Sequence, residues 1–156
     1  MTGIDFMQFA LAEARLAAEA GEVPIGAVVV QGGAIIARGQ NRVLRDLDPT
    51  AHAEIVALRA AAAALGNYRL AGCTLFVTLE PCAMCAGAMI HARLARLVFA
   101  AADPKAGAAG SVLSVLNHPQ LNHQMQVEQG ILGDEAAELL RSFFRERRSA
   151  SSASVL

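Results

Sequence analysis

The sequence predicts an α/β fold, in which helices pack against a central sheet. Short apolar, β-branched runs alternate along the chain with longer segments whose apolar residues recur at helical spacing. Between residues 73 and 100 the order is strand, helix, strand, which predicts two parallel strands joined by a right-handed crossover. The chain is 54% hydrophobic and rich in alanine, a composition that favours helices packed closely against a sheet.

The first forty residues are predicted to form a helix followed by a hairpin. Phe6, Phe9 and Leu16 fall on one helical face, and Gly21 suits the position just after the helix. An apolar run typical of a buried strand follows, and a Gln-Gly-Gly sequence then marks a tight turn. The expected elements are a helix over 5–20, a strand over 25–30, a turn over 31–33 and a strand over 34–38.

A polar, irregular segment over residues 39–50 leads directly into a helix predicted over 51–65. The apolar residues of this helix recur at helical spacing, and Gly66 ends it. His52 and Glu54 are therefore expected in its first turn. Unpaired backbone N–H groups at that end of a helix favour an ionised carboxylate.

The next unit is a strand over 73–79, a helix that begins at Pro81 and ends near His91, and a strand over 97–100. Proline suits the first helical position because its missing N–H would have no partner there. This unit is the βαβ element that predicts the parallel part of the sheet.

The last third of the chain is expected to hold one more strand and a final helix. Asp134 is the expected N-cap of that helix, and we assign Phe143 and Phe144 to its apolar face rather than to a surface for stacking bases. The other segments are expected to be a loop over 101–110, a short helix over 111–116, a loop over 117–123 and an edge strand over 125–128.

Two short motifs place metal-ligand chemistry at the starts of two helices, around His52 and Glu54 and around Cys82 and Cys85. The cysteines lie three residues apart, so they face one side of their helix, whose N-terminus lowers thiol pKa values. One imidazole and two thiolates suit zinc, and three protein ligands leave one position open for water, as in catalytic sites. Glu54 is the expected proton carrier. The pattern H-x-E followed by P-C-x-x-C is the known signature of zinc-dependent nucleobase deaminases.

A C-x-x-C pair also occurs in redox proteins and in structural zinc sites. The redox interpretation gives no role to the His-x-Glu motif. A structural site requires a fourth ligand, for which the candidates are Cys73, His91, His118 and His123. We interpret Cys73 as an inert core residue and the three histidines as packing, surface or loop residues, and we therefore favour a catalytic site.

Length, charge and cysteine content narrow the possibilities further. The chain of 156 residues fits one domain over residues 1–148, followed by a serine-rich tail over 149–156 that we expect to be disordered. A net charge of -1 gives no general attraction to polyanions, so any nucleic acid must meet a local basic patch. Three cysteines, two of them in the C-x-x-C, fit a reducing compartment. We expect no export signal and no membrane span, and hence a cytoplasmic protein.

Longer runs of sequence resemble the bacterial tRNA-specific adenosine deaminases of the TadA type, within the cytidine-deaminase-like superfamily. The zinc motifs alone point only to the superfamily. The resemblance extends from about residue 5 to residue 148, which would form a single zinc-dependent deaminase domain. The runs that carry it are residues 22–27, 41–42, 48–54, 67–70, 77–91, 107–111 and 143–145.

This resemblance implies a three-layer fold with a mixed five-stranded sheet in the order 2-1-3-4-5, and a homodimer with one zinc ion per subunit. His52, Cys82 and Cys85 would bind the zinc. The implied reaction converts the wobble adenosine of an arginine tRNA anticodon stem-loop to inosine. In it, zinc-bound hydroxide would attack C6 of adenine while Glu54 shuttles protons.

The resemblance also implies residues that bind the RNA. Asn41 would contact the target nucleoside, Asp103 and Lys105 its neighbours in the anticodon loop, and Arg147 and Arg148 the RNA backbone. Without the resemblance, residues 103 and 105 would be assigned to an ordinary solvated loop. The two arginines would equally suit the C-terminal end of a helix, where cations are favoured.

The chain departs from the family pattern in this substrate loop. Ala102 stands where the family usually has arginine, and Pro104 stiffens the turn. The segment over 43–47 also differs from the usual loop. We expect these changes to affect substrate affinity rather than the chemistry.

Two other functions fit the same residues. A deaminase of a free base or nucleoside, of the guanine or cytosine type, would use the same zinc chemistry but show little dependence on salt, whereas tRNA binding weakens steeply with salt. A non-catalytic zinc-stabilised binding module would hold the metal and release no ammonia from any nucleoside or RNA.

Overall fold

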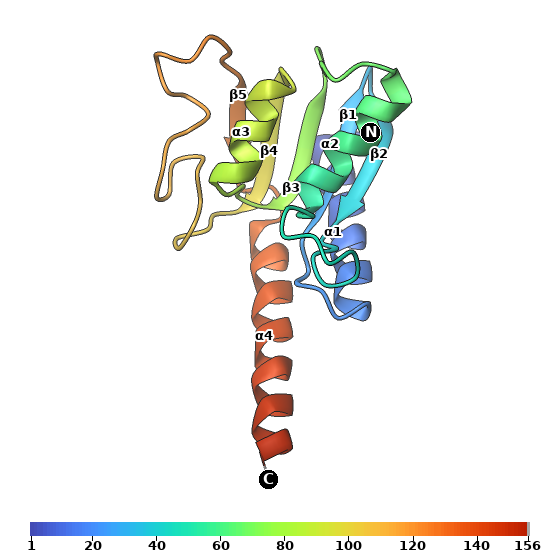
Figure 1. The fold of residues 1–156 in the computed structure, drawn as a ribbon, viewed down its shortest axis with the longest axis vertical. Helices are drawn as coiled ribbons and strands as arrows, with labels where there is room; N and C mark the ends of the chain where they lie inside the picture. Colours follow the sequence, from blue (N-terminus) through green and yellow to red (C-terminus); the bar gives the residue numbers. More distant parts are fainter. Residues whose placement is uncertain (156) are drawn as a thin grey trace.

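The computed structural model describes residues 1–155, and the side chains of residues 1–150. The chain alternates helices and strands as the sequence predicts (Figure 1). Within residues 1–155, no helix has both the length and the apolar character that crossing a membrane requires. The elements are α1 (Gly3–Glu19), β1 (Gly26–Gln31), β2 (Ala34–Gln40), α2 (Ala53–Leu65), β3 (Thr74–Leu79), α3 (Ala83–His91), β4 (Arg96–Ala101), β5 (Gln126–Gln129) and α4 (Gly133–Val155).

The five strands form one mixed sheet in the order β2-β1-β3-β4-β5, which confirms the order that the resemblance implies. β1 pairs antiparallel with β2 on one side and with β3 on the other. β3, β4 and β5 are parallel to one another, and α3 is the crossover between the first two of them.

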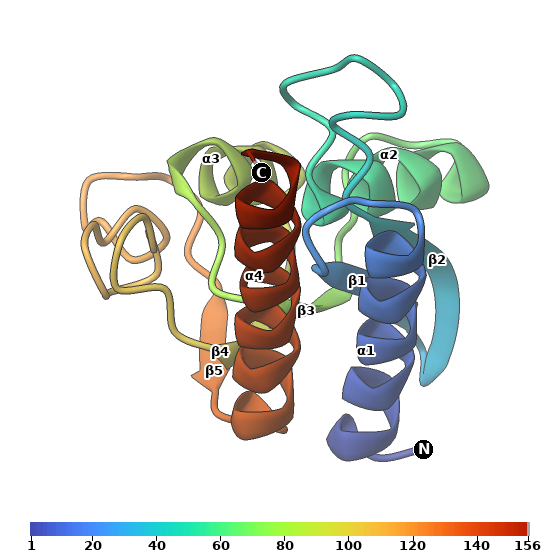
Figure 2. The same ribbon diagram turned by 90° about the horizontal axis from the view of Figure 1, so that it is seen from below.

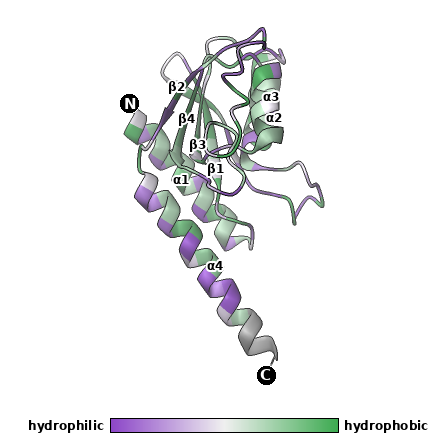
Figure 3. Cartoon of the chain, turned by 90° about the vertical axis from the view of Figure 1, so that its left-hand side faces the viewer, coloured by the Kyte–Doolittle hydropathy of each residue, from purple (hydrophilic) through white to green (hydrophobic). Residues whose placement is uncertain are grey.

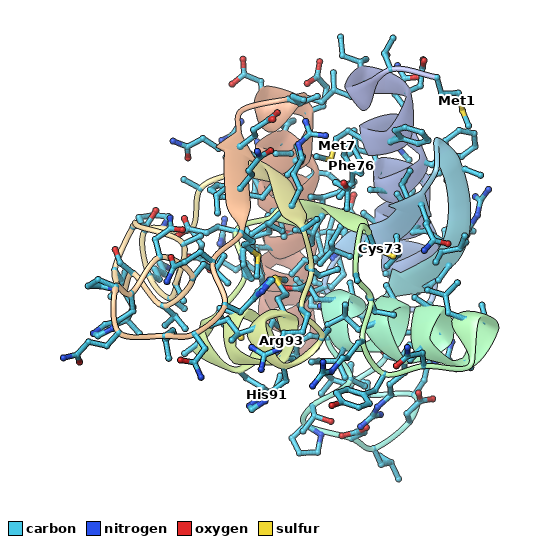
Figure 4. The ribbon with its side chains drawn as sticks, turned by 90° about the horizontal axis from the view of Figure 1, so that it is seen from above. Met1, Met7, Cys73, Phe76, His91 and Arg93 are labelled. Carbon is cyan, nitrogen blue, oxygen red and sulfur yellow. The ribbon has the colours of Figure 1, made fainter. Side chains whose placement is uncertain are left out.

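Helices cover both faces of the sheet, so the protein has three layers (Figure 2). α1 and α4 lie on one face, and α2 and α3 lie on the other. Side chains alternate between the two faces along each central strand. In β3, Leu75 and Val77 belong to the core beneath α2 and α3, whereas Phe76 belongs to the core beneath α1. Figure 4 shows Met7 of α1 beside Phe76. Burial on both faces explains why these strands are mostly apolar.

α4 runs well past the sheet, and its far half is mostly polar (Figures 1 and 3). The sequence predicts a disordered tail over 149–156, whereas the structure continues the helix as far as Val155. Extending an existing helix is far easier than starting one, and this serine- and alanine-rich segment holds no glycine or proline to stop it. Residue 156 lies outside the described residues.

The prediction of a short helix over residues 111–116 is wrong. The segment is irregular and folds back on the chain just before it. The backbone N–H of Leu113 donates to the carbonyl of Gly107, and that of Val115 donates to the carbonyl of Ala108. These bonds replace the i→i−4 bonds that a helix requires.

Two predicted helix starts are shifted by a residue or two. Pro81 lies outside α3, which has Cys82 as its N-cap. The Pro81 carbonyl accepts a hydrogen bond from the Ala108 N–H, at 2.8 Å, and belongs to the segment before the helix. α4 begins at Gly133, two residues earlier than an N-cap at Asp134 would give, so Asp134 lies in its first turn.

Candidate metal centre and active site

The topology of the sheet brings the starts of α2 and α3 together. β2 and β3 point the same way, because each is antiparallel to β1. Their carboxyl ends therefore lie at one edge of the sheet, and the chain leaves each end to begin a helix on the same face. Such an edge is where ligand sites form in α/β sheets.

A glycine allows α2 to lie directly on β2. A Cβ on Gly39 would overlap the carbonyl oxygen of Ala53 and approach the backbone nitrogen of Ala57 to 2.6 Å. Only a residue without a side chain fits there. The first turn of α2 is thus seated against the strand that leads to it.

His52 and Cys82 are the N-cap residues of α2 and α3. The sequence predicts His52 inside the first turn, and the structure places it one residue earlier. Both residues have extended backbone conformations, and neither side chain caps its own helix. Their side chains are therefore free to meet a common ligand.

The predicted ligands His52, Cys82 and Cys85 form one cluster, with their ligand atoms within 4.8 Å of one another. The His52 Nδ1 atom is 3.6 Å from the Cys82 Sγ and 3.5 Å from the Cys85 Sγ. Zinc bonds of about 2.3 Å to sulfur and about 2.0 Å to nitrogen, at a tetrahedral angle, separate the two ligand atoms by about 3.5 Å. The distances from the imidazole to both sulfur atoms therefore suit a tetrahedral zinc ion.

The cluster concentrates negative charge on sulfur. Hydrogen bonds from Cys85 and His52 lower the pKa of Cys82 to about 3, against the opposing effect of burial. The pKa of Cys85 is raised, because its thiol hydrogen bonds to Cys82 and because it is buried. The hydrogen bond to Cys82 also raises the pKa of His52. A cation replaces such shared protons when it binds thiolates.

Glu54 lies in the first turn of α2 and is only 4% exposed. Burial raises the pKa of Glu54 to about 7, although its own backbone N–H and the charge on His52 oppose the increase. A helix N-terminus by itself would favour the ionised form, so burial outweighs it here. A pKa near neutrality suits a group that must both accept and return a proton.

Asn41 is attached to the start of α2. Its side-chain oxygen accepts a hydrogen bond of 3.0 Å from the backbone N–H of Ala53, the residue between His52 and Glu54. This bond supplies one of the partners that the first N–H groups of a helix lack. The same orientation leaves the amide nitrogen of Asn41 available to a ligand beside the cluster.

The loop that holds Asp103 and Lys105 is anchored on a buried carboxylate that sequence reasoning missed. Glu80 is 2% exposed and accepts hydrogen bonds from the backbone N–H groups of Asp103, Ala109 and Ser111, at 2.9–3.1 Å, and from the Ser111 hydroxyl. Burial would raise the pKa of Glu80, but these bonds lower it below its usual value. The side chain of Asp103 accepts the N–H of Lys105, at 3.0 Å.

The loop over 103–111 is bound to the segment that leads into the cluster of His52, Cys82 and Cys85. A Cβ on Gly107 would overlap the Glu80 carboxylate, so the loop wraps it only because the residue is glycine. Glu80 and Pro81 immediately precede Cys82. The substrate loop of the sequence prediction is therefore fixed to the segment that delivers Cys82, a candidate metal ligand.

The two predicted arginines point to different sides of α4. Arg147 donates to the carbonyl of Gly21 and lies over the ring of Phe143, 4.7 Å from its centroid. Arg148 instead lines a hollow of about 410 Å³ that we call the basic groove. The structure thus brings Arg148, but not Arg147, to the side of Lys105. The basic groove is lined by Lys105, Leu140, Arg141, Phe144, Arg145 and Arg148.

The assignment of both phenylalanines to the core holds for one of them. Phe143 is buried, whereas Phe144 is 43% exposed within the basic groove. The two rings pack edge to face, with centroids 5.5 Å apart. Phe144 is thus an exposed aromatic surface among cations.

None of the other candidate ligands joins the cluster. Cys73 is fully buried, and burial raises its pKa. His91 is exposed at the end of α3 and points outward (Figure 4). His118 accepts the N–H of Gln120, and the ring of His123 lies 2.6 Å from the carbonyl oxygen of Leu94. The arrangement therefore leaves the fourth position of a tetrahedral metal to a molecule other than these residues.

Comparisons with known proteins agree with this geometry. The sequence profile of the MafB19-like deaminases matches residues 1–148. A tRNA-specific adenosine deaminase of Agrobacterium fabrum is 52% identical over 143 residues, which are 92% of this chain and 94% of that protein. A tRNA-specific adenosine deaminase of Bacillus subtilis is 47% identical over 148 residues, 95% of this chain and 92% of the relative.

Solved structures give the same result. A structure from work on A-to-I editing by tRNA:A34 deaminases, at the wobble position of transfer RNA, superposes with a TM-score of 0.85 and 50% identity. The match covers 87% of this chain and 99% of that chain. A guanine deaminase from Nitrosomonas europaea superposes with a TM-score of 0.81 and 30% identity, over 91% and 84% of the two chains.

Proposed function

Because the chain belongs to the MafB19-like deaminases, and within them to the family of the tRNA-specific adenosine deaminases, we propose that it converts adenosine to inosine in tRNA. The observation that carries this proposal is the cluster of His52, Cys82 and Cys85 with the buried carboxylate of Glu54 beside it. The target would be the wobble adenosine of an arginine tRNA anticodon.

Zinc is the cofactor that this site would hold, with one ion for each chain. His52 would bind it through Nδ1, the nitrogen that faces the two sulfur atoms. Zinc held there supplies a Lewis acid that makes water a nucleophile at neutral pH.

Glu54 would carry the protons of the reaction. It would take a proton from the attacking water and give it to N1 of adenine as C6 is attacked. It would then take the second proton of the former water from the new hydroxyl group on C6 and give it to the departing amine. Ammonia leaves and inosine remains. A pKa near 7 allows both transfers, because the donor and acceptor forms are then populated together.

Asn41 would hold the target nucleoside. Its oxygen is engaged with the start of α2, so its amide nitrogen is the group that faces a substrate. The adenosine must leave its neighbours to enter the site, which is inexpensive in a single-stranded anticodon loop.

The basic groove would bind the RNA beside the target. It combines four cationic side chains with the exposed ring of Phe144, and single-stranded nucleic acids bind to such mixtures of charge and aromatic surface. Lys105 would contact nucleotides next to the adenosine, together with Asp103, and Arg148 would contact phosphates. Arg147, which is turned toward α1, would act mainly by holding the end of α1 against α4.

The direct test is to incubate the protein with an arginine tRNA that carries adenosine at the wobble position, and to sequence the product for inosine. We expect inosine at that position only, with one zinc ion per chain by metal analysis. Deamination of free adenosine or cytidine without reaction on the tRNA would contradict the proposal. Zinc binding with no ammonia release from any substrate would instead indicate a binding module.

A second candidate is deamination of a free base, which the similarity to the guanine deaminase favours. The two functions predict different responses to salt. Activity on tRNA should fall steeply between 50 and 200 mM salt, because phosphate contacts release counterions, whereas activity on guanine should change little. Turnover of guanine that exceeds turnover of tRNA would support this second candidate.

We also propose that the protein is a homodimer. We propose further that it works in a reducing compartment such as the cytoplasm. Met84 on α3, and Val112 and Leu113 in the loop before β5, are exposed apolar side chains that a second copy would cover. Metal-binding thiolates must remain reduced. Light scattering after size-exclusion chromatography should give twice the mass of 16.3 kDa.

A further inference from the structure

The loop that follows β2 is closed at its base and has little apolar packing at its tip. The N–H of Arg42 donates to the carbonyl of Ala51, at 2.9 Å, which joins the two ends of the loop. At the tip, Leu44 is 59% exposed and Leu47 is 89% exposed. Leu47 also has a φ of 48°, which is unusual for a leucine. Burial of apolar surface therefore does not fix the position of this loop.

A buried carboxylate fixes it instead. Glu22, in the segment between α1 and β1, is 2% exposed. It accepts hydrogen bonds from the backbone N–H groups of Leu44 and Arg45, at 3.1 and 2.9 Å. Although burial would raise the pKa of Glu22, these bonds and the Arg45 guanidinium lower it below its usual value. The carboxylate is thus held ionised against the loop.

Arg45 connects this carboxylate to the residue that would hold the nucleoside. Its Nε donates to Glu22 at 3.1 Å, and a terminal nitrogen donates to the carbonyl of Asn41 at 2.5 Å and to the side chain of Gln40 at 2.9 Å. The side-chain oxygen of Asn41 in turn accepts the N–H of Ala53 at the start of α2. One continuous set of hydrogen bonds therefore leads from Glu22 to the start of α2.

We propose that Glu22 and Arg45 are positioning residues for the deamination reaction, which act by fixing Asn41. Glu22 and Arg45 would hold the backbone of Asn41. The side-chain oxygen of Asn41 then stays on the N–H of Ala53, and its amide nitrogen is presented to the nucleoside. This inference rests on the proposed function. Arg45 falls in the segment over 43–47, which the sequence sets apart from the usual family loop.

The alternative explanation is that Arg45 binds RNA directly as a cation. Its side chain is 28% exposed, so a phosphate can reach it. The two explanations differ in what Glu22 does. A positioning role requires Glu22, whereas a direct phosphate contact does not, because neutralising Glu22 would leave the cation in place.

The test is a mutant cycle measured as kcat/KM, with zinc content and thermal unfolding recorded for every variant. The parent is assayed first on the anticodon stem-loop and on free guanine, and the substrate that it deaminates is used throughout. If the parent deaminates guanine but not the anticodon stem-loop, the proposed function is overturned, and the mutant cycle can still be measured on guanine. A parent that deaminates neither substrate overturns both proposals.

We expect Arg45→Ala and Glu22→Gln each to lower kcat/KM by about tenfold, the loss expected from one mispositioned hydrogen bond. Zinc content should be unchanged. The double variant Asn41→Ala, Arg45→Ala should be no worse than Asn41→Ala alone, because Arg45 would act only through Asn41. Arg45→Lys keeps the charge but lacks the planar fork that reaches two partners, so it should resemble Arg45→Ala.

Arg59→Ala is the matched control. Arg59 of α2 pairs with Asp48 of this loop, its side chain is 68% exposed, and within the described residues it forms no hydrogen bond with Asn41. It should behave like the parent. The proposal would be overturned if the loss of kcat/KM in the double variant equalled the product of the losses in Asn41→Ala and Arg45→Ala. Parent-like activity of Glu22→Gln together with a weaker salt dependence in Arg45→Ala would also overturn it.

Discussion

At the scale of single residues, two buried carboxylates near the candidate metal ligands have opposite properties. Glu54 and Glu80 are both almost completely buried. Burial raises the pKa of Glu54 to about 7, and its own backbone N–H and the charge on His52 oppose the increase only in part. Four donors surround Glu80 and lower its pKa despite the burial. The first carboxylate can exchange a proton near neutral pH, and the second serves as a fixed anchor.

Glu54→Gln should remove activity without removing the metal. The amide keeps the shape of the side chain but cannot carry a proton, and proton transfer of this kind contributes about 10²–10⁴-fold to a rate. The measurement is the rate of inosine formation with zinc content determined in parallel. Glu19→Gln, on an exposed position of α1, is the control. Activity at the parent rate with zinc bound would exclude Glu54 as the proton carrier.

Glu22 should make the stability of the protein depend on pH. Its pKa is lowered in the folded state, so it contributes stability that is present above its ordinary value of 4.5 and is lost as pH falls through the folded value. Glu22→Gln should lower the unfolding free energy by about 1–3 kcal/mol at pH 7, because its buried donors lose a charged partner. The difference from the parent should shrink at pH 3.5. Chemical denaturation of both proteins at the two pH values measures this, and an equal difference at both would contradict it.

The sequence marks the three candidate metal ligands, which the structure gathers into one cluster, but it does not mark the anchoring residues. His52, Cys82 and Cys85 belong to motifs whose spacing reflects helix geometry, which local sequence contains. Glu22 and Glu80 bind backbone N–H groups more than twenty residues away along the chain. Backbone groups are the same in every residue, so no side-chain pattern marks such partners. The only signal is an acidic residue next to apolar strands.

At the scale of elements, close contact between a helix and a strand sets the position of the site. α2 meets β2 at Gly39, and the chain then passes through Asn41 and the loop to His52. The strands and long helices were predictable from periodicity. The segment over 111–116 was not, because its backbone bonds to residues 107 and 108 rather than to itself.

Gly39→Ala should push the start of α2 away from the sheet. The added methyl group would overlap backbone atoms of Ala53, which cannot move aside as a side chain can. We expect a loss of about 1–3 kcal/mol in unfolding free energy, as for other overpacked sites, and weaker zinc binding. Gly87→Ala in α3 is the control, because a Cβ there meets no atom within 4 Å. It should be neutral or stabilising by up to about 1 kcal/mol. Equal effects of the two changes would contradict this explanation.

At the scale of the whole molecule, charge is distributed unevenly. The net charge of -1 gives no general attraction to RNA, yet one groove gathers four cationic side chains around an exposed ring. α4 builds most of this groove and also extends past the sheet (Figure 1). Composition cannot reveal such a patch, because it depends on which residues the helix and the loop bring to one side.

Arg148→Ala should reduce the salt dependence of RNA binding. Each phosphate contact that is lost should lower the slope of log affinity against log salt by about 0.7 for a single strand. The measurement is binding of the anticodon stem-loop at several salt concentrations. Arg15→Ala is the control, because Arg15 lies beside Asp134, Glu135 and Glu138 on another part of the surface. A reduced slope in the control but not in Arg148→Ala would place the RNA elsewhere.

The two N-cap residues have one more consequence, for the way the protein opens locally. The side chains of His52 and Cys82 do not cap their own helices and turn toward a common point. Metal binding there would join two helix ends that otherwise fray independently. Amide hydrogen exchange at the starts of α2 and α3 should therefore slow together as zinc is added, while exchange at the far end of α4 stays the same. The metal would thus act as a staple between two local unfolding units as well as a participant in catalysis.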